Sequence, residues 1–209
     1  DFSIRRCKAK FTISGKDTCA GIWGSIYTGN KGHAAECLLI GDITATVYDR
    51  LHFGGGVGYL GSAGCASLVE NCLALVNIDG SIGSTRTGGF VGHCSGGTVR
   101  NCYCSGTLSA QTDQEGAFFG TESTGFTAEN NYYNSSVSGL GDFNGAVPLI
   151  TVQINDQSQF AGWDFQYAWK MLDGPMLRRL IALNDSYNNK LNKAYGYKNN
   201  VAYGEGNND

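Results

Sequence analysis

The sequence predicts an all-β fold: a right-handed parallel β-solenoid (β-helix) of about five coils over residues 1–140. A small mixed α/β capping segment is expected over residues 141–183, and an extended tail over residues 184–209. Three observations lead to this prediction. The 209 residues include 31 glycines and 2 prolines, a composition that favours many tight turns. A line of about thirty residues recurs along the chain, and within each line the core-facing positions alternate with mostly polar ones.

The recurring line is clearest around Cys102. The text "VRNCYCSGTLSA" aligns with "VENCLALVNIDG" at Cys72, "AAECLLIGDITA" at Cys37, "IRRCKAKFTISG" at Cys7 and "AENNYYNSSVSG" at Asn131. The successive offsets are 30, 35, 30 and 29 residues. A β-sandwich also has short strands and turns, but it gives no reason for residue columns to repeat in register. The repeat therefore favours the solenoid.

Every second residue of a line is expected to face the core. The predicted core ladder consists of Cys7, Cys37, Cys72, Cys102, Ile13, Ile43, Ile78, Leu108 and Val137. The intervening positions are mostly polar, although Leu38, Leu73 and Leu75 interrupt that pattern. One coil cannot bury its inward face alone, so the coils must stack to form a continuous core.

A second pattern, glycine–apolar–apolar–glycine, precedes the cysteine of the next line at residues 21–24, 58–61 and 89–92, and in weaker form at 117–120. It predicts two short strands per coil joined by glycine-bearing corners. The run "GGGVG" at residues 54–58 is not followed by Gly-Lys-Ser/Thr or by a helical pattern. It is therefore interpreted as a corner and not as a phosphate-binding loop.

The eight cysteines raise the question of disulfides or a metal. Stacked cysteines of the ladder are interpreted as buried free thiols that fill the core. Disulfides fit the positions outside the ladder better, namely Cys19, Cys65, Cys94 and Cys104. A metal site built from His93, Cys94, Cys102 and Cys104 lacks the Cys-x-x-Cys pairs of structural zinc sites. The prediction is therefore no metal and no cofactor.

Neither catalysis nor nucleic-acid binding is predicted. The acids Asp49, Asp79, Asp113 and Glu115 fall in different coils, whereas glycoside hydrolysis needs two acids about 5–9.5 Å apart. No histidine has a serine or cysteine partner recognisable by spacing. The basic stretches are short, the net charge is −3, and no apolar run approaches the roughly 20 residues of a membrane-spanning helix. No catalytic residue, nucleic-acid partner or membrane span is therefore expected.

Aromatic residues gather after the last line. Phe160, Trp163, Phe165 and Trp169 are predicted to form a cap that covers the apolar end of the stack. An exposed platform for carbohydrate is the alternative interpretation of the same rings. Asp164 between two of these rings is expected to accept hydrogen bonds in a turn.

The last 26 residues are rich in asparagine, tyrosine and glycine, which is typical of a linker. The four tyrosines of this tail are candidate assembly contacts: Tyr187, Tyr195, Tyr197 and Tyr203. They are expected to lie on the flank of their own solenoid or against a neighbouring copy. An open edge on the first coil would offer the tail of another copy a place to dock.

The line "GGFVGHCSGGTVRNCYCSGTLSA" resembles the GLUG-motif repeats of bacterial surface and secreted proteins. The resemblance rests on Gly88–Gly92, Gly96-Gly97, Asn101-Cys102-Tyr103 and Gly106. The segment "FAGWDFQYAWKMLDGPML" is similar to the closing segment of such solenoids, although Pro175 lies one residue earlier than in that pattern. The resemblance implies an adhesin-like, cell-surface or extracellular location.

The function expected from these observations is non-enzymatic. The chain is predicted to be a structural or adhesive β-solenoid module, with the filament subunit as one form of it. Its expected partners are further copies of itself, other surface proteins, or a glycan or host surface ligand. The longer insertions at residues 46–56 and 80–87 are the expected contact loops. The alternative is a non-catalytic or carbohydrate-active part of a larger secreted enzyme.

Overall fold

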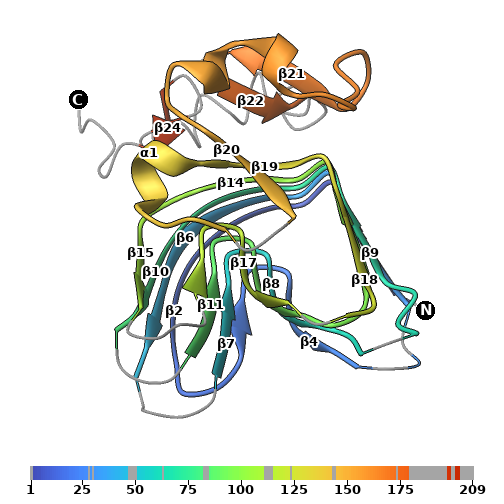
Figure 1. Ribbon diagram of the computed structural model, residues 1–209, viewed down its shortest axis with the longest axis vertical. Helices are drawn as coiled ribbons and strands as arrows, with labels where there is room; N and C mark the ends of the chain where they lie inside the picture. The colour runs from blue at the N-terminus through green and yellow to red at the C-terminus, as the bar shows by residue number, and fades with distance from the viewer. Residues whose placement is uncertain are drawn as a thin grey trace.

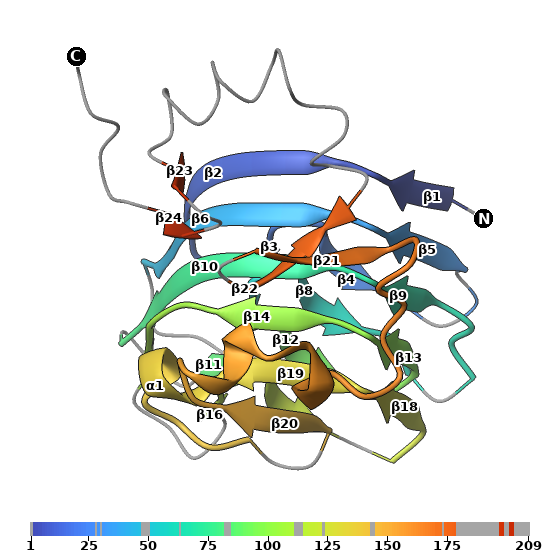
Figure 2. The ribbon, with the colours of Figure 1, turned by 90° about the horizontal axis from the view of Figure 1, so that it is seen from above.

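The computed structural model describes residues 2–27, 29, 31–46, 51–62, 64–81, 85–110, 115–122, 124–142, 145–172, 174–178, 197–198 and 201–202. Its main body is a parallel β-solenoid of about four turns (Figure 1). Each coil is stacked on the preceding one, so that strands about thirty residues apart in the sequence are neighbours (Figure 2). The predicted fold class is confirmed.

Each full coil contributes to all four sheets, with one strand in each sheet except that the fourth coil has two strands in sheet B, and not two strands in total as the glycine pattern suggested. Sheet A comprises β1 (Phe2–Arg5), β5 (Gly32–Ala35), β9 (Leu68–Glu70), β13 (Gly97–Arg100) and β18 (Phe126–Glu129). Sheet B comprises β2 (Lys8–Gly15), β6 (Leu38–Ala45), β10 (Leu73–Gly80), β14 (Tyr103–Ser105), β15 (Leu108–Ala110), β19 (Asn131–Asn134) and β20 (Ala146–Leu149). Sheet C comprises β3 (Cys19–Ala20), β7 (Leu51–Gly54), β11 (Thr85–Gly88) and β16 (Glu115–Gly116). Sheet D comprises β4 (Trp23–Ile26), β8 (Val57–Leu60), β12 (Val91–Cys94) and β17 (Phe119–Glu122).

The insertions expected to form contact loops belong partly to this framework. Leu51–Gly54 and Thr85–Gly88 are strands of sheet C, paired in parallel through four residues each. The parts of both insertions at residues 47–50 and 82–84 lie outside the described residues.

The corner between sheets A and B explains why the repeat reads Asn-Cys. The residue directly before the cysteine of each line, or before Asn131 in the last line, has a left-handed backbone conformation, with φ between 50° and 56°. These corner residues are Arg6, Glu36, Asn71, Asn101 and Asn130. Asparagine tolerates this conformation better than other residues with a side chain. The sharp corner turns the chain so that the next residue points into the core.

The glycine pattern starts at the corner between sheets C and D in three coils, but in the second coil that corner is Gly55-Gly56 and residues 58–60 of the pattern lie in β8. In each coil two successive N–H groups donate to one carbonyl of the next coil, as Phe90 and Val91 do to the Phe118 carbonyl at 3.0 and 2.9 Å. A Cβ atom on Gly88 would collide with the carbonyl of Val91. The turn therefore needs glycine at this point because the backbone folds back on itself.

The cysteine column lies in the core as predicted. Cys37, Cys72 and Cys102 are fully buried, and Ile43 and Ile78 of the neighbouring column are buried too. The ends of the stack differ from the prediction. Cys7 is exposed and Ile13 only partly buried, because they lie in the first coil, and Leu108 is also only partly buried.

Val137 departs most from the ladder: it is 40% exposed. It belongs to the short helix α1 (Ser135–Ser138) and not to a strand. Asn134 starts this helix by accepting a hydrogen bond from the Ser136 N–H at 3.1 Å, and Gly139 ends it with φ of 70°. The strand period of two therefore stops applying after Asn134.

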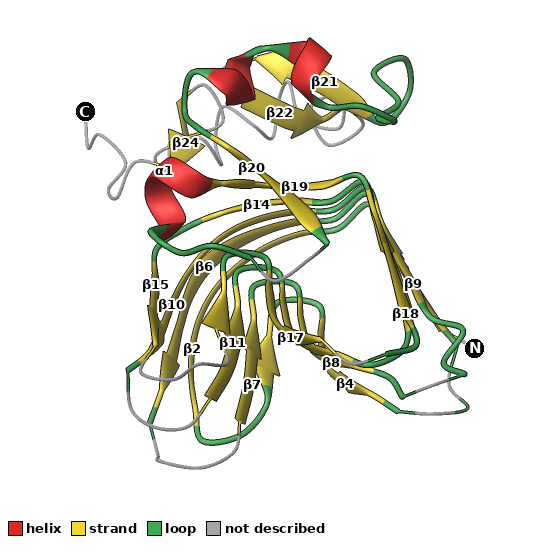
Figure 3. Ribbon diagram, in the orientation of Figure 1, coloured by secondary structure: helices red, strands yellow, loops and turns green. Residues whose placement is uncertain are grey.

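A second apolar layer covers the outer face of sheet B. Here the chain folds into two 3-10 helices, η1 (Gln153–Asn155) and η2 (Gln157–Gln159), and an antiparallel pair, β21 (Trp169–Leu172) and β22 (Gly174–Leu177). Figure 3 places these short helices and this strand pair above the sheet. We refer to residues 150–178 as the flank segment. It buries the leucines that interrupted the polar pattern, Leu38 and Leu73, in a cluster separate from the solenoid core.

Residues 139–149 close the C-terminal end of the stack. Asp142 Oδ1 accepts hydrogen bonds from the Phe118 and Phe119 N–H groups at 3.0 and 2.8 Å. In the preceding coils a backbone carbonyl of the next coil accepts the equivalent pair. β20 then pairs with β19 as the last strand of sheet B, and its Pro148 has no N–H to offer another strand.

Candidate functional site

Sheets C and D meet at an angle whose apex points toward sheet B (Figure 1). Phe53 and Thr87 of sheet C point into the core and are fully buried, so the alternate residues His52 and Arg86 face outward. His93 of sheet D stacks against His52. We use the name C–D angle for the cluster of side chains that lies where the two sheets meet. It comprises Thr18, His52 and Arg86 from the sheet C side and Tyr59, His93 and Thr121 from sheet D.

Ring contacts fill the base of the C–D angle. The centroids of His52 and Tyr59 are 5.3 Å apart, those of Tyr59 and His93 5.4 Å, and those of His52 and His93 5.5 Å. Tyr27 extends the stack on Tyr59 at 5.4 Å and is 64% exposed. The cluster thus runs from a buried histidine to a solvent-exposed tyrosine.

Hydrogen bonds orient these rings. An Arg86 nitrogen lies 3.3 Å from His52 Nε2, and because a guanidinium can only donate, Nε2 must accept. The other nitrogen of a neutral ring, Nδ1, then carries the proton and donates to Thr18 Oγ1 at 3.4 Å. His93 Nδ1 pairs with Thr121 Oγ1 at 3.1 Å, and Ser95 Oγ donates to the Tyr59 hydroxyl at 3.3 Å.

Both histidines are held in the neutral form. Burial, followed by the nearby Arg86 charge, lowers the pKa of His52 to about 4, against a smaller opposing effect of Asp17. Burial, Arg86 and His52 lower the pKa of His93 to about 4 as well, although Thr121 opposes the shift. Imidazoles with so low a pKa are weak bases at neutral pH. The C–D angle is therefore suited to stacking and hydrogen bonding, with one fixed cation.

The sequence interpretation missed this cluster. It considered the histidines one at a time and looked for serine or cysteine partners. The usable signal was the repeat itself, since His52 and Arg86, like Tyr59 and His93, are one repeat apart and pair in register. What the repeat did not reveal is that the two columns face each other across a bend.

A charged cluster lies on the outer face of sheet A. Glu70 accepts from Arg100 Nε and an Arg100 terminal nitrogen at 3.0 and 2.7 Å, and it pairs with His33 Nε2 at 2.8 Å. Burial opposes ionisation of Glu70, but the Arg100 and His33 hydrogen bonds hold its pKa below the usual range. These residues are matched to one another across three coils and stabilise the stacking.

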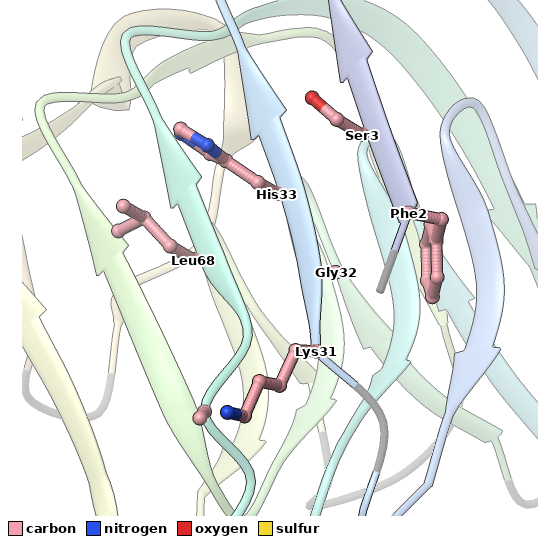
Figure 4. A pocket seen from close by; sticks show the side chains of 7 residues that line it. Phe2, Ser3, Lys31, Gly32, His33 and Leu68 are labelled. Atoms are coloured by element: carbon pink, nitrogen blue, oxygen red, sulfur yellow. The ribbon is translucent and has the colours of Figure 1, made fainter.

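A pocket of about 450 Å³ lies beside this cluster, at the N-terminal end of sheet A. It is lined by Phe2, Ser3, Lys31, Gly32, His33, Ala66 and Leu68 (Figure 4). Its ionisable side chains are Lys31 and His33, and His33 is already engaged by Glu70. The lining offers no pair of groups for acid–base chemistry.

All eight cysteines are free thiols. The sequence alternative of disulfides among Cys19, Cys65, Cys94 and Cys104 has no counterpart in the structure. Six thiols are buried, whereas Cys7 is exposed and Cys19 partly exposed. Burial raises the pKa of Cys104 well above the ordinary thiol value, and burial with neighbouring ladder thiols does the same for Cys72.

The described part of the chain has neither a metal-binding cluster nor a membrane-spanning helix. Among those residues, no three histidine, cysteine or acidic side chains come together in a way that could hold a metal ion. Within the same ranges, no helix has the length and apolar character required to cross a lipid bilayer.

The predicted aromatic cap forms a cluster, but in a different place. Trp169 is fully buried, Trp163 stacks on it with centroids 3.9 Å apart, and Phe160 and Phe165 pack around them. The Trp163 and Trp169 indoles donate to the Asn130 carbonyl and to Asn71 Oδ1, so the cluster lies along the outer face of sheet B. The prediction that it covers the end of the stack is wrong, because residues 139–149 already occupy that end.

Asp164 accepts from the Gln166 and Tyr167 N–H groups, both at 2.9 Å, as expected of a turn acceptor. Of the candidate assembly tyrosines, Tyr187, Tyr195 and Tyr203 lie outside the described residues. Tyr197 is described only by its place in the two-residue strand β23 (Tyr197–Lys198), which pairs with β24 (Val201–Ala202).

Comparison with known proteins returned no match to a family model, to a curated protein or to a solved structure. Function is therefore inferred from the geometry of this chain.

Proposed function

We propose that this chain is a non-enzymatic structural module, a stiff β-solenoid that acts as a spacer or adhesive element at the cell surface or outside the cell. The observation that supports it is the continuous register of the stack. β2, β6 and β10 pair over seven or eight consecutive residues. A rod tied by parallel ladders on four sheets resists bending because deformation must break many backbone hydrogen bonds together.

Cross-coil side-chain contacts add to this stiffness. Asn77 donates to Asp42 Oδ1 at 3.0 Å and accepts from the Thr107 N–H at 3.0 Å. Glu70 links coils in the same way on sheet A. Polar groups that connect neighbouring coils are expected in a load-bearing element.

An extracellular location is consistent with the shielding of the thiols. Free cysteines outside the cell are exposed to oxidants, and reactivity requires an accessible thiolate. Burial of six of the eight thiols opposes both conditions.

Single-molecule pulling tests the mechanical role. A stack that yields coil by coil should lengthen in steps of about 100 Å, from roughly 30 residues at about 3.4 Å each. One low-force event for the whole chain would contradict a load-bearing role. Hydrolysis of a polysaccharide by the purified chain would contradict the non-enzymatic assignment.

The C–D angle favours carbohydrate binding as a second candidate function, within an adhesin or a larger secreted enzyme. Exposed Tyr27 and half-buried Tyr59 offer ring faces to the C–H groups of a sugar, and the neutral histidines and Arg86 offer hydrogen bonds. A glycan array with the wild-type chain and Tyr59→Ala tests it. Tyr167→Ala, which removes a 58% exposed ring on the flank segment, is the matched control. Equal glycan binding by both variants would exclude the C–D angle.

A further inference from the structure

We propose that the C–D angle binds a linear polysaccharide whose chain lies along the solenoid axis, so that successive coils contact successive sugars. The inference rests on the carbohydrate-binding candidate function, and it names the ligand class and the direction in which the ligand lies. It follows from the way the side chains of the angle repeat from coil to coil.

The polar side chains of sheet D form a column that runs through four coils. Ser25 pairs in register with Tyr59, Tyr59 with His93, and His93 with Thr121. Each of these four residues carries a hydroxyl or a neutral imidazole, and both groups can donate as well as accept a hydrogen bond. A ligand rich in hydroxyl groups therefore finds a suitable partner on each coil.

The column on the sheet C side continues the same chemistry. His52 and Arg86 pair in register, and the Thr18 hydroxyl lies 3.4 Å from His52 Nδ1. The two columns are in contact, because the centroid of the His52 ring is 5.3 Å from that of Tyr59 and 5.5 Å from that of His93. A chain that follows the angle is therefore flanked by hydrogen-bonding side chains from both sheets.

The spacing of the columns suits a polymer better than a single sugar. Neighbouring coils are one strand spacing apart, so Ser25 and Thr121 lie about 14 Å from each other along the axis, a length that an extended chain of about three or four sugars spans. A single sugar would contact only one or two coils. A chain gains from each further coil, because binding of one sugar places the next beside its own side chains.

The tyrosines supply the ring surface for such a chain. Tyr59 of β8 is only partly buried, and Tyr27, which directly follows β4, lies against it with centroids 5.4 Å apart. Aromatic rings pack against the apolar C–H groups of sugars. The C–D angle thus combines ring contacts with a few oriented polar groups, as ligand sites generally do.

The arrangement of the strands disfavours an extended peptide as the polymer. Peptides of that kind bind by adding a strand to an exposed sheet edge. In this solenoid the sheet edges face along the axis, and β8 and β12 in the middle of sheet D are paired on both sides. The C–D angle therefore presents side chains, and not unpaired main-chain groups, to its ligand.

Calorimetric titration of the 209-residue chain with oligosaccharides of increasing length tests the proposal. The probes are linear oligomers of glucose, mannose, galactose and N-acetylglucosamine, each from one to six units. In the series that binds, the affinity should rise at least about tenfold from one unit to three and level off near four or five units. Tyr59→Ala should weaken the binding of every length, because it removes the central ring.

A bulky residue placed in the sheet D column should shorten the length that a chain can occupy. Ser25→Trp, at an exposed position of β4, should make the affinity level off about one unit earlier, because the contacts of one coil are lost. Thr12→Trp is the matched control, since Thr12 is an exposed residue of β2 in sheet B. It should show the same length dependence as the wild type.

The outcomes separate this proposal from the function on which it rests. Equal affinity for one unit and for six would overturn the linear-chain proposal and leave binding of a single sugar as the carbohydrate function. A length dependence unchanged in Ser25→Trp would also overturn the proposal, because the chain would then lie elsewhere. Binding of none of the four series would overturn both the proposal and the carbohydrate candidate, and it would leave the structural function unaffected.

Discussion

At the residue scale, the stack depends on a few side chains that take the place of backbone hydrogen-bond partners. Asp142 supplies the acceptor that a further coil would supply, and Asn131 adds side-chain hydrogen bonds to the preceding coil at the ladder position. Asn131 Oδ1 accepts from the Cys102 N–H at 3.1 Å, and its Nδ2 donates to the Val99 carbonyl at 2.9 Å. A buried backbone group without a partner is costly, so these side chains stabilise the last coil of the stack.

Replacing Asp142 tests this role. Asp142→Ala leaves the Phe118 and Phe119 N–H groups without their acceptor and should lower the free energy of unfolding by about 2 kcal/mol. Asp142→Asn keeps an oxygen at the same place and should lose less than half of that. Urea denaturation measures both. Equal losses for the two variants would show that charge, and not the acceptor, matters.

The histidines of the C–D angle predict acid sensitivity. Each has a pKa near 6.5 in the unfolded chain and about 4 in the folded one. Between these values the unfolded state binds more protons, so stability should fall as pH decreases from about 6.5 to 4. The urea midpoint should fall less in His52→Gln with His93→Gln than in the wild type. If the urea midpoint of the double variant fell as steeply as that of the wild type between pH 7 and 4.5, the result would contradict the buried neutral state of the two histidines.

The exposure of the thiols predicts how many cysteines react with a thiol reagent in the native chain. A thiol reagent should modify Cys7 and Cys19 in the native chain and all eight cysteines after denaturation, because the other six are buried. Ellman titration measures both numbers. In Cys7→Ser with Cys19→Ser the native reaction should disappear, and a residual fast thiol would show that the core opens readily.

At the element scale, the flank segment is held by its indoles. It covers Leu38, Leu73 and Tyr103 on the outer face of sheet B, and it completes a two-layer packing that sheet B alone lacks. Its turns supply their own hydrogen bonds, as Asp156 does for Ser158. It therefore acts as a docked layer that stabilises the middle of the stack.

Trp169→Ala should detach this layer. Loss of a fully buried indole typically costs about 3–5 kcal/mol, and the uncovered leucines should bind a hydrophobic dye. Tyr167→Ala, at an exposed position two residues earlier, should change stability by less than about 0.5 kcal/mol. Thermal unfolding and dye fluorescence distinguish the two variants. Retained stability in Trp169→Ala would mean that the sheet does not depend on the layer.

At the scale of the whole molecule, stability should vary along the axis. Coils in the middle are covered on both sides and partly by the flank segment, whereas β1 and β2 of the first coil each pair with one other described strand. In a stack whose repeats contact only their neighbours, the ends open first.

Amide hydrogen exchange measures this gradient. Protection should be highest in β6 and β10, and lowest of the long strands in β2. Uniform protection across the three strands would contradict opening from the end.

The repeat made the solenoid, the buried cysteine column and the corner within residues 54–58 predictable, because each follows from short-range periodicity. The position of the aromatic layer was not predictable in the same way. Leu38, Leu73 and Leu75 signalled that the outer face of sheet B is covered, yet they did not indicate by what. Val137 was misassigned because Asn134 starts a helix where the repeat pattern still continues.

The sequence by itself determined the coil: its length, its inward face and its glycine-bearing corners. These are local properties of backbone conformation and alternation. Only the tertiary structure decided which columns face each other in the C–D angle and that residues 139–149, and not the aromatic segment, close the stack. Those features depend on the path of the chain between coils, and the free energies that fix it come from contacts between residues far apart in sequence.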